Sequence, residues 1–320
     1  MTESSKQAMS DHAEMLSVSV VLAVFDSAEQ VRQTIDSVLK QQGVSLEFIV
    51  VDDGASTAVK KQLEVAAADP RVTVLSQSNQ GLTKALIAGC RAASHPYIAR
   101  IDTGDRMLPG RLAAQAAQLQ RNPKLAMVSS WVDVVTLEGY ELYTVKNTAE
   151  QLQRGLTSSD PASVVTPFHA SVMFRQSSYI AVGGYRTEFY FAQDYDLWSR
   201  MIRHGGIDVL PETFTLGVFS ASGISGQYAA EQQALKEIVI QLASVRSAGK
   251  SEHQLLEQAA EITKSSASSS SDEFAGLYFI GCCLMDTGSE HAGDYLTRAL
   301  RARPWSLKGW VRYLRWRLSA

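Results

Sequence analysis

The amino-acid sequence predicts an α/β fold with a mostly parallel sheet, followed by a helical C-terminal region. Short β-branched runs alternate with amphipathic helical patterns in the first third of the chain, which is typical of βαβ units with right-handed crossovers. Acidic residues stand directly after several of the predicted strands. Beyond residue 226 the pattern changes and only helical periodicity continues.

Four short apolar runs have the length of buried strands. They cover residues 17–24, 48–51, 72–75 and 97–101. Helices are expected between them, after Ser27 and over residues 57–68 and 82–93. Ser27 and Gln30 have the spacing of a capping box, which predicts that the first helix begins there.

The bulk composition describes an ordinary soluble protein. The chain has 320 residues, enough for one large domain and a smaller one, and its net charge of -3 argues against nucleic acid as the main partner. Three cysteines form neither a disulfide framework nor a metal knuckle, which predicts a reduced, cytosolic protein. Residues 1–15 are expected to be loosely ordered, and no window approaches the ~20 apolar residues that span a bilayer.

The strongest functional pattern lies in residues 97–112. A short apolar run ends at Asp102-Thr-Gly-Asp105, and Pro109 then leads into a helical pattern. Ligands of a parallel sheet gather at the carboxyl ends of its strands, so both carboxylates are expected beside a substrate. Two close carboxylates also suit a divalent cation. The alternative is a polar turn whose Asp residues cap the next helix.

Other carboxylates fall at the same predicted edge. Asp26 follows the first strand, and Asp52 and Asp53 follow the second. A nucleotide site explains such a collection, because carboxylates accept hydrogen bonds from a base N–H or from ribose hydroxyls. No glycine-rich phosphate loop is present, which disfavours P-loop and dinucleotide-binding proteins.

Several motifs then combine into one pattern. They are SVVLAVFD at 19–26, IVVDDGAS at 49–56, NQGL at 79–82, IARIDTGD with LPGRL at 98–112, and PFHASVMFR, VGGY and QDYDLWSR between 167 and 200. In this order they resemble glycosyltransferase family 2, over roughly residues 16–225. The resemblance implies inverting, nucleotide-sugar-dependent enzymes of the GT-A fold.

The resemblance also implies residue roles. Asp194 resembles the catalytic base, Asp102 resembles the first Asp of the Asp-X-Asp metal and nucleotide motif, and His169 and Gln193 resemble positions on the sugar or acceptor side. The positions expected to bind the nucleotide sugar are Val24, Phe25, Asp26, Asp53, Lys84, Arg100 and Asp102.

A divalent metal, Mg or Mn, is the implied cofactor, with Asp102 as the main ligand and Asp105 as a helper. Three positions depart from the family pattern: Gly104 replaces the second Asp of the metal motif, Gln193 replaces a Glu, and Asp26 stands where many relatives carry Asn. If metal is not needed, Lys84 or a nearby Arg is expected to stabilise the leaving group.

The helix that starts at Asp194 gives the base assignment a physical basis. Its carboxylate would lie at a helix N-terminus, where the dipole is expected to keep it ionised. The alternative is an ordinary N-cap worth about 1 kcal/mol. His169 is either substrate-lining or a structural histidine. Asp196 and Arg200 are expected on the exposed side of this helix as a surface pair.

The predicted function is transfer of a sugar from a nucleoside-diphosphate donor, with UDP favoured, to a hydroxyl of a cell-surface glycan or lipid-linked acceptor. The alternative is a non-catalytic nucleotide-sugar-binding or assembly protein. The expected location is cytoplasmic, with peripheral contact at the inner face of the cell membrane.

The expected domains are a glycosyltransferase domain over 16–226 and a helical region over 227–320 with a Ser-rich linker at 265–271. From 298 to 317, basic residues alternate with Trp and Leu, and no acidic residue follows Asp294. Such a segment fits a membrane interface. The alternative is that its aromatic rings pack on the preceding helical hairpin, 274–302.

Overall fold

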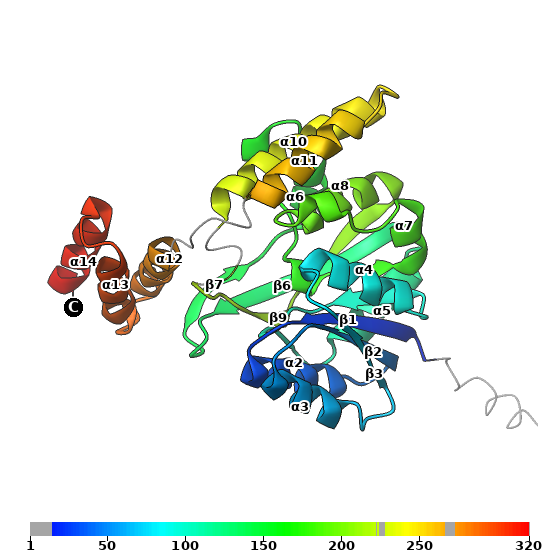
Figure 1. Ribbon diagram of the computed structural model, residues 1–320, viewed down its shortest axis with the longest axis horizontal. Coiled ribbons are helices and arrows are strands. Elements are labelled where there is room, and N and C mark those ends of the chain that lie inside the picture. Colours follow the sequence, from blue (N-terminus) through cyan, green and yellow to red (C-terminus); the bar gives the residue numbers. More distant parts are fainter. Residues whose placement is uncertain (1–14, 222, 224–227, 266–272, 320) are drawn as a thin grey trace, which may run out of the picture.

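A nine-stranded sheet forms the centre of the computed structural model, which describes residues 15–221, 223, 228–265 and 273–319 (Figure 1). The strands are β1 (Ser17–Val24), β2 (Ser45–Asp53), β3 (Val72–Gln77), β4 (Tyr97–Arg100), β5 (Arg106–Met107), β6 (Leu125–Val135), β7 (Glu141–Val145), β8 (Met173–Arg175) and β9 (Gly206–Val218). Their order is β3-β2-β1-β4-β8-β6-β9-β5, with β7 paired to β6. β1 to β4 are parallel to one another, as predicted, and β9 is parallel to β6.

Helices cover both faces of this sheet and continue beyond it. They are α2 (Ala28–Leu39), α3 (Thr57–Ala66), α4 (Leu82–Ala92), α5 (Arg111–Arg121), α6 (Ala149–Thr157), α7 (Gln176–Ala181), α8 (Gln193–His204), α10 (Ala229–Ser247), α11 (His253–Ser265), α12 (Glu273–Asp286), α13 (Ala292–Ala302) and α14 (Leu307–Ser319). Short 3-10 turns occur at Pro161–Ser163, His169–Ser171 and Thr187–Phe189. The predicted α/β domain with a helical C-terminal region is confirmed.

The start of α2 differs from the prediction. Ser27 is the N-cap residue, but its φ is +73° and its side chain makes no capping hydrogen bond. The Ser27 amide instead donates to Asp26 Oδ1 at 2.7 Å. The expected capping box is therefore absent here, whereas Thr148 and Gln151 form one at the start of α6.

The strand β1 is apolar on both sides because both of its faces are buried. Val21 packs in the core beneath α4 and α8, whereas Val20 and Leu22 pack in the core on the face covered by α2, α3 and α5. All three side chains are fully buried. Burial on both faces fixes the carboxyl end of β1 in place, and the site described below lies at that end.

The helical C-terminal region packs in two places. α10 and α11 share a core with α8, to which Leu235 and Leu242 contribute. α12 and α13 pack against β6 and β7, where the rings of Tyr140 and His291 stack at 3.8 Å. The predicted boundary at residue 226, residues 1–14 and the Ser-rich run after Ser265 lie outside the described residues, so those predictions stay untested. Across the described ranges, no helix has the length and apolarity to cross a bilayer.

The expectation of an exposed Asp196–Arg200 pair is wrong. The two side chains are 1% and 3% exposed, and Arg200 Nη2 donates to Asp196 Oδ2 at 2.5 Å. Arg200 also donates to the Val182 carbonyl at 2.6 Å, and Arg186 lies 3.8 Å from Asp196. Val182 and Arg186, which precede α8 in the chain, meet this side of the helix, and a helical wheel of α8 alone does not reveal them.

Removing one partner of this buried pair should be costly. Arg200→Ala removes the side-chain hydrogen bonds of the buried Asp196 carboxylate and leaves it only the charge of Arg186 at 3.8 Å, so we expect the free energy of unfolding to fall by about 3–5 kcal/mol. The matched control is Arg154→Ala, because Arg154 forms an exposed pair with Glu150 at 3.8 Å with the same i,i+4 spacing. The control should lose less than about 1 kcal/mol. Urea denaturation measures both, and equal small losses would contradict the buried assignment.

Candidate active site

The candidate site lies at the carboxyl ends of β1, β2 and β4, which meet at one edge of the sheet. Asp53 ends β2 and is buried. Its Oδ1 accepts from Gln77 Nε2 at 2.7 Å and from the Gln80 amide at 2.8 Å, and its Oδ2 accepts from the Gly81 amide at 2.8 Å. A carboxylate has about four lone-pair positions, so Asp53 holds the β3–α4 loop and keeps one acceptor position free.

Tyr190 supports the same loop from the other side. Gly81 has φ +87°, and a Cβ at this position would lie 2.9 Å from the Tyr190 ring. Only glycine therefore fits between the loop and this ring. Through this contact the segment that precedes α8 is tied to the loop held by Asp53.

The end of β1 presents the three residues expected to meet the nucleoside. Val24 is buried, so its contribution is limited to its backbone. Phe25 is 53% exposed, and Asp26 is exposed with Oδ1 bound to the Ser27 amide. An exposed aromatic ring at this edge has the chemistry to stack on a base.

Arg100 and Asp102 form the centre of a buried polar network. Arg100 is fully buried, and its Nη2 donates to Asp102 Oδ1. Its Nη1 donates to the Ile101 carbonyl at 2.6 Å, and its Nε donates to His169 Nε2 at 3.2 Å. His169 Nε2 lies 2.8 Å from the Tyr185 hydroxyl. Sequence reasoning missed Tyr185, whose only signal was its place in the VGGY motif.

This network fixes the charge states of its members. Burial alone would raise the pKa of Asp102, but the charge of Arg100 outweighs it and holds that pKa below its usual value. Burial and then the charge of Arg100 lower the pKa of His169 to about 3. His169 is therefore a neutral hydrogen-bonding group at neutral pH, and Asp102 is an ionised carboxylate.

Asp105 makes a contact inside the protein, and its role as a helper metal ligand stays a prediction. Its side chain is buried, and its Oδ1 accepts from the Val218 amide at 2.7 Å. Gly104, with φ +100°, lets the chain turn so that the Asp105 amide donates to the Asp102 carbonyl at 3.1 Å. Burial and then the nearby Asp102 charge raise the pKa of Asp105 well above its usual value.

Asp194 is held in the first turn of α8. Its side chain is partly buried, and its Oδ1 accepts from the Tyr195 amide at 2.8 Å. Burial raises the pKa of Asp194, opposing the helix N-terminus that was expected to keep it ionised. The Trp198 ring of the same helix lies 5.9 Å from the His169 ring, which links α8 to the Arg100 network.

Gln193 points away from the site. It is buried, and its amide nitrogen, oriented toward the preceding turn, donates to the Phe189 carbonyl at 3.2 Å and to the Tyr190 carbonyl. The expected role of Gln193 in lining the acceptor side therefore has no support from its contacts. Its position instead shapes the turn that presents Asp194.

The comparison with protein families shows to which family the chain belongs. The model of glycosyl transferase family 2 matches residues 19–183, which include Asp53, Arg100, Asp102 and His169. The chain belongs to glycosyltransferase family 2. The prediction of a glycosyltransferase is thereby confirmed.

Two relatives of this glycosyltransferase are named for polysaccharide biosynthesis. The amylovoran biosynthesis glycosyltransferase AmsE of Erwinia amylovora is 30% identical over 198 residues, 60% of this chain and 71% of that protein. The O-antigen biosynthesis glycosyltransferase WbnJ of Escherichia coli is 27% identical over 192 residues, 58% of this chain and 71% of that protein.

One solved structure matches nearly the whole chain. It is the mannosyltransferase PcManGT from Pyrobaculum calidifontis in complex with GDP-Man and Mn2+, with a TM-score of 0.56 and 17% identity. The match covers 92% of this chain and 89% of that chain. At this identity the likeness shows the fold, and the predicted GT-A fold is confirmed.

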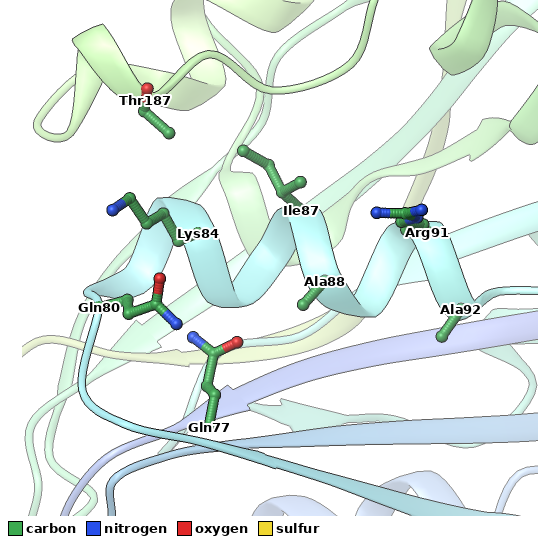
Figure 2. A pocket seen from close by; sticks show the side chains of 8 residues that line it. All are labelled: Gln77, Gln80, Lys84, Ile87, Ala88, Arg91, Ala92 and Thr187. Atoms are coloured by element: carbon green, nitrogen blue, oxygen red, sulfur yellow. The ribbon is translucent and has the colours of Figure 1, made fainter.

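Lys84 of this glycosyltransferase lies in an open groove along α4 that encloses about 670 Å³ (Figure 2). Lys84 and Arg91 project from opposite ends of the helix, and Thr187 lies across from Lys84. Gln80, next to the loop held by Asp53, shares the groove. Lys84 is therefore near the β3–α4 loop and not in the Arg100 network.

A metal ion would find one suitable carboxylate here. Among the described residues, no group of three or more His, Cys, Asp and Glu side chains could hold an ion alone. Mg²⁺ is usually bound by one or two carboxylates together with substrate phosphates. The Asp102 side chain is 33% exposed, and its Oδ2 lies 3.8 Å from His169 Nδ1 with no hydrogen bond. This oxygen fits a cation shared with a donor diphosphate.

Proposed function

We propose that the enzyme transfers a sugar from a nucleoside-diphosphate donor, with UDP-sugars favoured, to an acceptor hydroxyl by one inverting displacement. The placement of Asp194 carries the proposal, because its carboxylate lines a pocket open to an incoming hydroxyl and has a raised pKa. A carboxylate with a raised pKa is a stronger base as long as it stays ionised at the working pH.

The donor side of the proposal rests on the other carboxylates. Asp53 has one acceptor position free for the base, the Phe25 ring can stack on it, and Asp102 would hold a divalent cation with the diphosphate. That cation, Mg²⁺ or Mn²⁺, supplies charge stabilisation for the leaving diphosphate. The buried Arg100 keeps Asp102 ionised and oriented, and the neutral His169 accepts from Arg100 Nε, which makes both of them positioning residues.

The acceptor is proposed to be a hydroxyl of a bacterial-type cell-surface polysaccharide or its lipid-linked precursor. Relatives named for amylovoran and O-antigen biosynthesis support this class. The alternative of a non-catalytic nucleotide-sugar-binding or assembly protein is disfavoured by membership in an enzyme family and by the presence of Asp194.

A donor panel tests the function. Purified protein is mixed with Mn²⁺ and single donors, including UDP-sugars and the GDP-mannose found in the structural neighbour, and release of nucleoside diphosphate is measured. One donor should be cleaved well above a no-protein blank, and slow cleavage should occur with water as the acceptor. No release from any donor would favour the non-catalytic alternative.

We also propose peripheral contact of this otherwise cytoplasmic enzyme with the inner face of the cell membrane through α14 and the preceding residues. One face of α14 carries exposed apolar side chains at helical spacing: Leu307, Trp310, Val311, Leu314 and Leu318. Arg315 and Arg317 flank this face by the geometry of an α-helix, whereas the Lys308 ammonium lies over the Phe274 and Tyr278 rings of α12. An apolar stripe bordered by basic residues suits an anionic lipid surface.

The opposite face of α14 is occupied. A Cβ at Gly293 of α13 would lie 2.1 Å from the Trp316 ring, so this ring packs directly on α13. Arg312 pairs with Asp286 at the end of α12. Packing on the hairpin and an exposed apolar stripe therefore belong to different faces of one helix.

Vesicle flotation tests the membrane proposal. The full chain should float with phosphatidylglycerol vesicles at low salt and less at high salt, since each basic residue near the surface is worth about 1 kcal/mol. Leu314→Glu should abolish flotation. Val65→Glu is the matched control, because Val65 is an exposed apolar residue on α3, and it should float like the parent. Equal flotation of both variants, or no flotation of the parent at low salt, would refute the proposal.

A further inference from the structure

A polar pocket of about 330 Å³ adjoins Asp194 between the start of α8 and α10. The start of α8 contributes Asp194 and Tyr195, the segment before the His169 turn contributes Thr166, and α10 contributes Gln232 and Lys236. Neither Asp102 nor Lys84 lines it. The residues that line this pocket thus differ from those proposed to hold the donor diphosphate, although the Asp102 charge acts on Asp194.

The α10 wall of this pocket is rigidly attached. Leu235, Val239 and Leu242 are buried in the core shared with α8. The Tyr228 ring just before α10 stacks on Phe191 with ring centres 4.4 Å apart. Because these contacts fix the helix against the segment that carries Asp194, the polar residues of α10 keep a defined position relative to that carboxylate.

Three polar side chains that line this pocket have no partner among the residues that the structure describes. Across the described residues, the side chains of Thr166, Gln232 and Lys236 make no hydrogen bond or ion pair. Lys236 is partly buried and does not pair with Asp194, although both line the pocket. The neighbouring Glu237 instead accepts a hydrogen bond from Gln233 at 3.1 Å. The ammonium of Lys236 is thus left for a ligand.

Opposite charges at two points of one pocket orient an acceptor. A sugar hydroxyl can donate to Asp194, and side-chain amides and hydroxyls such as those of Gln232 and Thr166 can both donate to and accept from further hydroxyls. An ammonium group binds carboxylate or phosphate oxygens by charge-assisted hydrogen bonds.

We propose that Lys236 selects an acceptor with an anionic group, a sugar carboxylate or a phosphate, close to the hydroxyl that Asp194 activates. The proposal names the acceptor class and rests on the proposed function for the role of Asp194. The donor diphosphate is also an anion that Lys236 could bind. Donor affinity must therefore be measured together with acceptor binding.

Fluorescently labelled full-length protein on a glycan array tests this selectivity. The array pairs uronic-acid glycans, and separately sugar phosphates, with their neutral counterparts, in the presence of Mn²⁺ and UDP. At least one acidic class should bind about tenfold more strongly than its neutral counterpart, the gain expected from one charged hydrogen bond. Stronger binding of uronic-acid glycans would indicate that the pocket recognises a carboxylate, and stronger binding of sugar phosphates would indicate that it recognises a phosphate.

Lys236→Met should bring the acidic and neutral binding signals to within about twofold of each other, because the charged hydrogen bond that gives the tenfold preference is removed. Lys264→Met, an exposed lysine of α11 outside the pocket, should keep the preference. Donor affinity should be unchanged in Lys236→Met, because Lys236 does not line the donor edge, and slow donor hydrolysis should be unchanged in Lys264→Met. Three results would each overturn the proposal. Neutral glycans could bind as well as acidic ones, acidic glycans could fail to bind, or Lys236→Met could keep the preference of the parent. Failure of the parent to cleave any donor would instead count against the proposed function.

Discussion

Asp194→Asn is expected to lower the turnover number of sugar transfer by about 10²–10⁴-fold, the usual contribution of a general base. Donor affinity should change little, because Asp194 lies outside the proposed diphosphate contacts. The Asn side chain keeps an oxygen that can accept from the Tyr195 amide, as Asp194 Oδ1 does at 2.8 Å. The substitution therefore removes the base and keeps the hydrogen bond to the Tyr195 amide in the first turn of α8.

Three measurements accompany this variant. A thermal melt should show an unchanged fold, a binding titration should show a parental donor affinity, and the pH dependence should change. In the parent, kcat/KM should fall on the acidic side as Asp194 takes up a proton, at a pKa above the usual 3.8 because burial raises it. Transfer by Asp194→Asn within a few-fold of the parent would exclude Asp194 as the base.

Asp102→Asn is expected to lower kcat/KM by about 10²–10³-fold and to weaken the response to Mn²⁺, since charge stabilisation by a cation is worth several kcal/mol. The reason is that Asp102 offers the site's one exposed, ionised carboxylate oxygen in the Arg100 network. The measurement is kcat/KM for the donor as Mn²⁺ is titrated.

Asp105→Asn is the matched control from the same loop. An Asn oxygen can still accept from the Val218 amide, and burial already favours a neutral group at this position. Its Mn²⁺ dependence should therefore equal that of the parent. If Asp105→Asn were as impaired toward Mn²⁺ as Asp102→Asn, Asp105 would be a metal ligand, as the sequence predicts, and not only a structural residue.

The strands, and the edge of the sheet where the site lies, were predictable from the local sequence. The four parallel strands were predictable because their residues are apolar on both faces, as the alternating core contacts of Val20 and Val21 show. The common position of Asp53 and Asp102 at one edge of the sheet was predictable because each follows or ends a predicted parallel strand. The start of α8 near Asp194 followed from its apolar periodicity.

The side-chain directions depended on distant segments. Asp105 turns inward because its acceptor position is filled by Val218, which lies on β9 and is 113 residues away. Asp196 and Arg200 are buried where Val182 and Arg186 meet α8. The polar wall with Gln232 and Lys236 belongs to α10, which the family model does not reach. The periodicity of apolar residues along the sequence does not indicate contacts between segments that are far apart in the chain.

The anomeric configuration of the first product tests the central claim, a single inverting displacement, most directly. Proton NMR spectra are recorded during the first minutes of donor hydrolysis, before the released sugar equilibrates between anomers, with water as the acceptor and Mn²⁺ present. An α-linked donor should release the β-sugar first. Release of the α-sugar would mean retention, and it would contradict the proposal that Asp194 activates an acceptor for one in-line attack.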